Sequence, residues 1–563
     1  MRTPKALYRT SPTLFTCELR HCPQCEGPLR PVGYVTGQKT IQTMQDVLTI
    51  AYRPKTCSET GCRAAEFPLP SAAWQHLAPK YSTYGYDVIA QIGWERQTGR
   101  ATFELIHARL RQHVQMSESM VRHLYHQKYL PLLACQERQQ WPALRALAQT
   151  SGLLLSLDGL MPEGGEAQLW VVRELQTGWT LRSGWLSHQD EATFATFLRP
   201  LAEVQLPIRA ILSDKQRGLL PALATVFPTV PHAWCQIHYL QNAAAPVADA
   251  DEQMKIALRQ GVRASVGELT RSGQKTPEKP AELTITGLVP SPLPAPAPPQ
   301  AVAEAAQEQV VQDLLQRVRY LLTLKGRPPF RLAGQEMFAR LQELVRCLDQ
   351  LLRHQSEPRL RQLREGLRQA LTAMRPTYRE LSVAADWLAR LAAVLDPAGQ
   401  PARTGAQVRA EWEACLTDLE RERQATPRLQ TLGAHITKVS WSYAPGLFHT
   451  YDVPGLPRTN NARESEFRDL KRRLVTTTGQ RGAVKRLLLR DGAWELIPTP
   501  ASLAETLTAI SQVTSHELRQ EEQRVSQHRA RFRLHTRSAK QSQAQLKQLV
   551  QRWKDIPTTN ALE

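Results

Sequence analysis

The sequence lacks the features of a membrane-spanning or exported chain. It contains no apolar run close to the roughly 20 residues that cross a bilayer, and its first residues do not show a charged segment followed by an apolar one. It is also short of acidic residues, with 52 Asp and Glu against 71 Lys and Arg, which gives a formal charge of +19. We therefore expect a cytoplasmic protein without a membrane partner that binds a polyanion such as nucleic acid.

A disulfide framework is not expected either, because the nine cysteines of this 563-residue chain would be reduced in the cytoplasm. Four of them instead form two close pairs, "CPQC" and "CSETGC", which are Cys22, Cys25, Cys57 and Cys62. Thiolates from two such turns give a tetrahedral zinc site, so we predict a zinc ribbon with one structural Zn²⁺ within residues 1–80. Cys17 and His21 are spare candidates as ligands. The alternative is a set of reduced, unligated thiols.

Residues 84–133 show the apolar spacing of three short amphipathic helices. Ser117 is expected to cap the third helix, which also carries Arg122 and Lys128. Short helices of this kind are typical of a helix-turn-helix, which lays one helix in the major groove of DNA. We assign residues 81–145 to such a domain and expect Arg122 and Lys128 to contact DNA. The alternative is a helical bundle used only for packing.

Two apolar strand segments that follow each end on an acidic residue. The first, "GLLLSLD", ends on Asp158 and the second, "IRAILSD", ends on Asp214, with two antiparallel strands and a turn at Thr177-Gly178 between them. A carboxylate at the end of a buried strand costs free energy unless a cation or a donor meets it. Two such carboxylates on neighbouring strands favour a divalent cation that prefers oxygen ligands. The alternative is that each Asp only caps the turn that follows it.

The remaining chain divides by composition and periodicity. Residues 246–440 have helical apolar spacing, interrupted by a segment at 272–300 that is rich in proline and lacks aromatic residues. We predict an all-α insertion, with a flexible or extended loop, between two parts of an α/β core at 150–245 and 441–500. Residues 501–563 are expected to form a basic helical tail that binds DNA or a second subunit. The alternative for the tail is a solvated helix or disorder.

The stretch "RTNNARESEF" offers a third carboxylate at the start of a helix. At about 100° per residue, Glu464 shares its face with amides and cations, whereas Glu466 lies on the other side of an apolar stripe. The residues on the face of Glu464 are Asn460, Asn461, Arg468 and Lys471. This placement favours Glu464 over Glu466 as a metal ligand. The alternative is a capping box, because Asn461 and Glu464 have the spacing of N-cap and N3.

Taken in order, "SLDG", "LSD", "CQIHYLQN" and "PRTNNARESEFRDLKRRL" resemble the motifs of DDE transposases of bacterial insertion sequences, of the Mutator-like type. The resemblance covers roughly residues 152–490. It implies an RNase H-like core, interrupted by the all-α insertion, in a multidomain α/β protein. It also implies that Asp158, Asp214 and Glu464 are the catalytic acids and hold two Mg²⁺ ions, which Mn²⁺ can replace.

The resemblance further places a C-x-x-H pair, Cys235 and His238, after the second acid. Two ligands alone make a poor zinc site. We therefore expect His238 to act in catalysis as a cation or as an imidazole that contacts phosphate. The alternative is a packing cysteine beside a buried histidine.

The predicted function is that of a transposase that binds transposon end DNA and catalyses Mg²⁺-dependent cleavage and strand transfer. The zinc ribbon and the helix-turn-helix would bind terminal inverted repeats, and Asn460, Asn461, Arg468, Lys471 and Arg472 would contact the transposon or target DNA. Pairing two ends implies a homodimer or a larger assembly, associated with the nucleoid. One alternative is a DNA-binding regulator or domesticated transposase that breaks no strands, and another is a different RNase H-like nuclease such as a junction resolvase.

Overall fold

The computed structural model describes most of residues 12–555. The segments outside the description are residues 1–11, 34, 36, 162–166, 273–298, 397, 399–401, 531–537 and 556–563. The side chains at 37, 270–272, 299–302, 462–464 and 481–483 are not described either. The Pro-rich loop expected at 272–300 therefore lies almost entirely outside the described residues.

The chain forms two compact units, each assembled from separate stretches of sequence. The first unit contains Met1–Ile211, Gln216–Val230 and Asn460–Glu563. The second contains Leu212–Lys215 and Pro231–Thr459. The chain therefore enters the second unit briefly at Leu212–Lys215, which includes Asp214, leaves the first unit again at Pro231 and re-enters it at Asn460.

The N-terminal part of the first unit consists of short strands and turns. Strand β4 pairs in parallel with β1 and antiparallel with β3, and β2 pairs antiparallel with β5. The elements are β1 (Thr13–Thr16), β2 (Leu29–Pro31), β3 (Gly37–Gln42), β4 (Val47–Arg53), β5 (Lys55–Cys57), α1 (Arg63–Glu66) and α2 (Ala72–Gln75). The β2–β5 pair brings the two cysteine turns together, because Cys57 ends β5 and is paired with Leu29.

The helices predicted between residues 84 and 133 are confirmed. They are α3 (Tyr86–Gln97), α4 (Phe103–Leu110) and α5 (Glu118–Leu124), and α5 continues through a π-helical turn, η2 (Tyr125–Tyr129), into α6 (Leu130–Gln139) and then α7 (Trp141–Ser151). The side chain of Ser117 accepts a hydrogen bond from the amide of Met120, as the predicted cap requires.

The described part of the C-terminal segment is helical, and much of it packs into the same core. It forms α19 (Leu503–Ser511), α20 (Ser515–Ala530) and α21 (Ala539–Lys554). Helix α19 contacts α3 and α6, and α20 contacts α6. Ile497, Ile510, Val513 and Leu518 are buried together with the apolar side chains of residues 84–135.

The α/β part is built on a five-stranded sheet with the strand order β10-β9-β6-β7-β8. Its strands are β6 (Leu153–Leu160), β7 (Gln168–Glu174), β8 (Thr180–Leu186), β9 (Ile208–Ser213) and β10 (His232–Trp234). Strands β6, β7 and β8 are antiparallel neighbours. The turn predicted between β7 and β8 is present, and Gly178 there has φ of 76°, a conformation that suits glycine.

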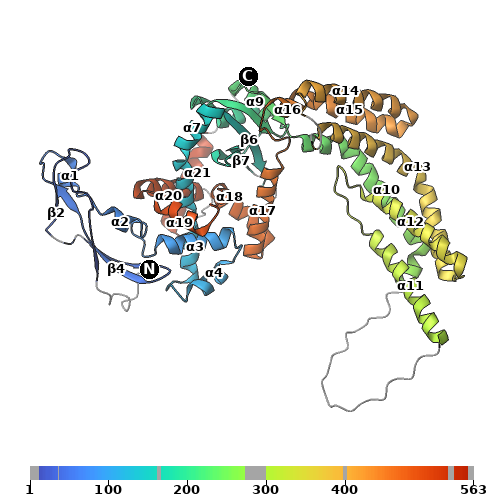
Figure 1. Ribbon diagram of the computed structural model, residues 1–563, viewed down its shortest axis with the longest axis horizontal. Helices are drawn as coiled ribbons and strands as arrows, with labels where there is room; N and C mark the ends of the chain where they lie inside the picture. Colours follow the sequence, from blue (N-terminus) through green and yellow to red (C-terminus); the bar gives the residue numbers. More distant parts are fainter. Residues whose placement is uncertain are drawn as a thin grey trace, which may run out of the picture. The chain divides into compact units, whose positions relative to one another are not determined.

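Helices cover both faces of this sheet in the first unit (Figure 1). Leu153, Leu155 and Leu157 of β6 pack against α7, α8 (Glu191–Glu203) and α9 (Leu219–Val226). Leu160 packs on the opposite face, against α17 (Asn461–Thr478) and α18 (Arg481–Glu495). Because side chains alternate along a strand, this arrangement assigns each residue of β6 to one of the two helical layers.

The second unit is largely helical, and the insertion expected at 246–440 lies within its sequence range. Its helices are α10 (Gln236–Ser272), α11 (Pro299–Leu321), α12 (Ala333–His354), α13 (Pro358–Leu395), α14 (Gly405–Glu422), α15 (Pro427–Leu447) and α16 (His449–Asp452). They enclose two apolar cores, one around Trp387 and Trp412 and the other around Phe338. In the described part of the chain, no helix combines the length and the apolar character needed to cross a membrane.

Candidate functional site

The four paired cysteines form one cluster, as predicted. The sulfur atoms of Cys22 and Cys62 are 3.5 Å apart and those of Cys25 and Cys57 are 3.4 Å apart, and all four sulfurs lie within 4.8 Å of one another. Backbone hydrogen bonding, first of all from Gln24, lowers the pKa of Cys22 to about 7. Hydrogen bonding from the backbone of Ala64 also acts to lower the pKa of Cys62, but burial and the other three thiols raise it to about 12. Four converging thiolates fit a tetrahedral Zn²⁺ ion.

Gly27 lies against the cluster. A Cβ atom added there would lie 3.3 Å from the sulfur of Cys25 and 2.8 Å from Cγ of Glu59, so a larger residue would require the exposed side chain of Glu59 to move. Cys17 is buried in the small core beside the cluster and is not a member of the four-sulfur group. Among the described residues, His21 also does not join it.

Asp158 lies on the sheet face that is covered by α17. It is not the last residue of its strand, which was the expectation, because β6 continues to Leu160. Asp158 and Leu160 share a face by alternation, and Leu160 packs with residues of α17. Oδ1 of Asp158 accepts a hydrogen bond of 2.8 Å from the amide of Gly159. Val171, its partner on β7, is buried in the same cluster as Leu160.

The start of α17 is tied to the strand that carries Asp158. Asn460, which is 2% exposed, donates a hydrogen bond of 3.3 Å from Nδ2 to the carbonyl oxygen of Leu157. The amide therefore places the first turn of α17 beside the residue that precedes Asp158. The DNA contact that the sequence predicts for Asn460 stays a prediction.

Glu464 lies in the first turns of α17, but its side chain is outside the described residues. The helix begins at Asn461, so Asn460 has the N-cap position and Arg463 has the N3 position. The capping-box alternative required Asn461 as the cap and Glu464 at N3. The observed helix start instead places Arg463 at N3.

Glu466 has a structural partner that the sequence did not reveal. Its Oε2 lies 2.5 Å from Nη1 of Arg173, a guanidinium that is 2% exposed on β7. The stripe predicted beside it is confirmed, because Phe467, Leu470 and Leu474 are all buried against the sheet. Glu466 therefore holds α17 on the sheet.

The polar residues predicted to contact DNA differ in their surroundings. Asn461, Arg468 and Arg472 of α17 are exposed, and Nζ of Lys471 donates to the carbonyl oxygen of Met161 at 2.9 Å. On the N-terminal helices, Arg122 forms an ion pair of 2.8 Å with Glu118. Nζ of Lys128 lies 2.6 Å from Oε1 of Glu522 on α20.

Asp214 belongs to a cluster in the second unit that also contains Cys235 and His238. Nδ1 of His238 is 2.7 Å from Oδ1 of Asp214, and the ligand atoms of the three residues lie within 4.8 Å of one another. Hydrogen bonding to Asp214, and then to Cys235, raises the pKa of His238 to about 11. The imidazole is therefore a cation at neutral pH and pairs with the acid directly.

Lys215, the residue next to Asp214, is held by two aromatic rings and a carbonyl oxygen. Its ammonium group lies 5.1 Å from the ring centroid of Trp234 and 4.8 Å from that of Tyr443, and it donates to the carbonyl oxygen of Ser442 at 2.6 Å. Burial lowers the pKa of this lysine. The two rings and the carbonyl of α15 thus fix the chain where β9 ends.

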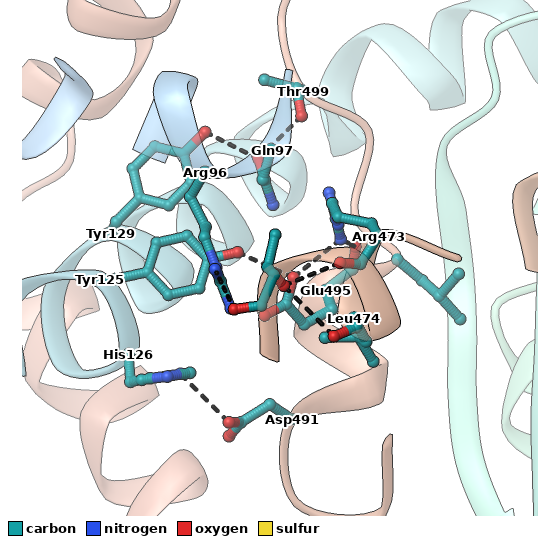
Figure 2. Close-up of polar contacts among 12 residues, drawn as sticks. Arg96, Gln97, Tyr125, His126, Tyr129, Arg473, Leu474, Asp491, Glu495 and Thr499 are labelled. Carbon is teal, nitrogen blue, oxygen red and sulfur yellow. Dashed lines mark hydrogen bonds and ion pairs between the residues drawn. The ribbon is translucent and has the colours of Figure 1, made fainter. Parts of the chain in front are cut away.

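A buried polar network links α17 to the N-terminal helices (Figure 2). Oε2 of Glu495 accepts hydrogen bonds of 2.8 Å from Nη2 of Arg473 and from the hydroxyl group of Tyr125. Nη1 of Arg96 reaches the carbonyl oxygen of Thr477 at 3.5 Å. The helix that carries Glu464 is therefore attached to α3 and η2. No local sequence pattern indicates these contacts, because Tyr125 and Glu495 are 370 residues apart.

Comparison with known proteins gives no family assignment. No family model and no curated protein matches the sequence. Among solved structures, the chain is similar to the Drosophila P element transposase strand transfer complex, with 11% identity and a TM-score of 0.26 over 78% of this chain and 94% of that one. This similarity is too weak to carry an argument about fold or function.

Proposed function

We propose that the chain is a DNA transposase of the DDE type with an RNase H-like core. The observation that carries the proposal is that Asp158 lies on the sheet face covered by α17, the helix that contains Glu464. Strand β9, which Asp214 follows, is the neighbour of β6 in the strand order. Three carboxylates on these elements suit hard divalent cations, which prefer oxygen ligands.

Asp158, Asp214 and Glu464 would hold two Mg²⁺ ions. When bound, these ions supply an activated water or DNA 3′-hydroxyl and stabilise the leaving oxygen of the phosphodiester. Asn460 fixes the first turn of α17 through the carbonyl oxygen of Leu157. His238 orients the carboxylate of Asp214 through their ion pair and offsets part of its charge.

The remaining modules would bring DNA to this core. The cysteine cluster would hold one Zn²⁺ and form a zinc ribbon, and the helices from α3 to α6 would form the helix-turn-helix. Together they would bind terminal inverted repeats, while exposed Arg468 and Arg472 of α17 contact phosphates. Joining two ends to a target would require a homodimer or a larger assembly.

Single substitutions of the three acids test the proposal. DNA flanking the coding sequence is searched for inverted repeats bordered by a short direct duplication, and these repeats supply the substrate. We expect Asp158→Asn, Asp214→Asn and Glu464→Gln each to lower Mg²⁺-dependent cleavage and joining by about 10²–10³-fold, as removal of one preorganised electrostatic group does. Affinity for end DNA is measured in parallel and should change little.

Glu466→Gln is the matched control on the same helix. It should retain most of the cleavage activity while lowering stability, because Arg173 loses a charged partner. Retained cleavage in any of the three acid variants contradicts the role of that acid. Sequence-specific binding by a wild-type chain that breaks no strands would instead favour a DNA-binding regulator.

A further inference from the structure

A hollow of about 530 Å³ in the first unit is lined largely by cationic side chains. Its walls come from α5 and η2, from α18 and from α20, which are far apart in the sequence. The cationic and imidazole groups in the lining are Arg122, His123, His126, Arg486, Arg490 and Arg529. Within the described residues, no carboxylate belongs to this lining. We call this feature the arginine hollow.

One buried carboxylate organises two of the arginines. Asp491 is 1% exposed, and its Oδ1 lies 2.7 Å from Nη2 of Arg529 while its Oδ2 lies 2.8 Å from Nη2 of Arg490. Nδ1 of His126 is 3.1 Å from Oδ2 of the same carboxylate (Figure 2). Two guanidinium groups therefore share one negative charge. The side chains of Arg490 and Arg529 are held in place, and the two arginines together with Asp491 keep a net positive charge.

The other two arginines add charge that the structure does not fully neutralise. Arg122 pairs with Glu118, but both side chains are largely exposed, so the pair is weak in water. Arg486 is exposed, and no carboxylate within the described part of the chain forms an ion pair with it. Four arginines against Glu118 and Asp491 leave a net charge of about two. Burial lowers the pKa values of His123 and His126, so this charge comes from the arginines and not from the imidazoles.

We propose that the arginine hollow binds phosphate groups supplied by the backbone of double-stranded DNA. The planar fork of a guanidinium group matches two phosphate oxygens, and a fork that is already fixed by Asp491 loses less side-chain entropy on binding. The hollow is also continuous with Arg122 on the helix expected to contact DNA. The choice of DNA as the source of phosphate rests on the proposed function, whereas the phosphate site itself is inferred from the arginines alone.

The salt dependence of DNA binding measures these contacts directly. The full chain with Arg486→Gln and Arg490→Gln is compared with the wild type on a short duplex of unrelated sequence, by fluorescence anisotropy without Mg²⁺. The dissociation constant is followed from about 50 to 200 mM KCl. We expect the slope of log affinity against log salt to fall by about 0.9 for each contact removed, or about 1.8 for the pair.

Two further double variants separate a site from a general charge effect. Arg145→Gln with Arg199→Gln removes the same charge from exposed positions on α7 and α8, and should leave the slope unchanged. The double variant Arg486→Lys with Arg490→Lys keeps both charges and should show most of the wild-type salt slope. Equal losses in the Arg486/Arg490 and Arg145/Arg199 glutamine pairs would overturn the proposal, because the effect would then come from net charge alone.

Tripolyphosphate distinguishes DNA from a free phosphate compound as the ligand. If it raises the melting temperature of the wild type but not of the Arg486/Arg490 glutamine variant, while the DNA slope is the same in both, DNA is not the ligand. An unchanged slope without any effect of tripolyphosphate overturns the phosphate site itself.

The outcomes also separate the phosphate site in the arginine hollow from the proposed transposase activity. If the wild type cleaves transposon ends but the variant shows an unchanged salt slope, only the phosphate site in the arginine hollow is refuted. If the variant shows the expected change in slope but the wild type breaks no strands, only the transposase activity is refuted.

Discussion

Residues 12–80 and residues 84–139 are neighbours in the chain, yet they are held together by different interactions. Among its described residues, the first segment has two small buried clusters, and three of the five members of one cluster are cysteines. The second segment belongs to an extensive apolar core that includes side chains from α19 and α20. A segment with so little apolar core needs a cross-link such as a metal ion, whereas the larger core does not.

The two segments differ in what is available to close them. In the N-terminal segment, β2 and β5 bring four thiols close enough together to hold one metal ion as a cross-link. In the helical segment, buried ion pairs and apolar residues from the end of the chain close the core. The two segments should therefore respond differently to chelators and to the loss of single charges.

Removing one cysteine ligand should have the largest effect. Binding of a structural Zn²⁺ contributes on the order of 10 kcal/mol to such domains. We therefore expect Cys57→Ser, or a strong chelator, to unfold residues 12–80 and to leave the helical core folded. Zinc content by atomic emission and amide hydrogen exchange at residues 29–31 and 55–57 would measure this.

Cys17→Ala provides the control from the same small core. It removes a buried sulfur outside the four-sulfur group, so the chain should keep one zinc ion and lose only packing free energy. A Cys57→Ser chain that retains its zinc and its protected amides would show that the cluster does not hold this segment together.

Loss of the carboxylate of Asp491 should have an intermediate effect. Asp491→Asn leaves Arg529, which is 4% exposed, without its counter-charge, and breaking such a buried pair costs about 3–5 kcal/mol. The free energy of unfolding from denaturant titration at neutral pH would measure the loss. Hydrogen exchange should place it in α18 and α20, and unchanged stability would contradict the role given to Asp491.

The difference in unfolding free energy between the wild type and Asp491→Asn should depend on pH, because the pKa of Asp491 is shifted in the folded state. Burial alone would raise the pKa of Asp491, but His126, Arg529 and Arg490 together hold it below its ordinary value of 3.8. The stabilisation is therefore fully present above pH 3.8 and is lost as the pH falls through the lower pKa of the folded state. The gap between the wild type and Asp491→Asn should be constant near neutral pH and shrink in acid.

The smallest effect is expected at the exposed pair on α5. Glu118→Gln breaks the ion pair with Arg122, in which both side chains are largely exposed, and should cost about 0.3–0.5 kcal/mol. Added salt should reduce even this difference. Denaturant titration at low and high salt would measure it, and a loss comparable to that of Asp491→Asn would mean that exposure does not decide the strength of these pairs.

The elements that were predicted correctly have signals within a few residues. The hydroxyl of Ser117 caps α5, Gly178 forms the turn between β7 and β8, and the apolar residues of α17 follow a helical period. The short spacing within each cysteine pair is also a local signal, and it predicted the four-cysteine cluster. In each case the neighbouring sequence alone determines the conformation.

What the sequence did not reveal depends on partners far away in the chain. The pairing of Arg173 with Glu466 spans 293 residues, and nothing near either residue indicates the other. The alternation of β6 could have shown that Asp158 and Leu160 share a face. However, the helix that covers this face is known only from the folded structure. The same holds for Asn460, whose amide finds a carbonyl 303 residues away.

The return of α19 and α20 to the N-terminal helices has a consequence for synthesis on the ribosome. The core around residues 84–135 is incomplete until Ile497, Ile510 and Leu518 have emerged, so the nascent chain carries an exposed apolar surface for most of its translation. A product that stops before residue 497 would keep that surface and become a substrate for chaperones or proteases. The N-terminal helices can therefore bury this surface fully only after the chain has grown past Leu518.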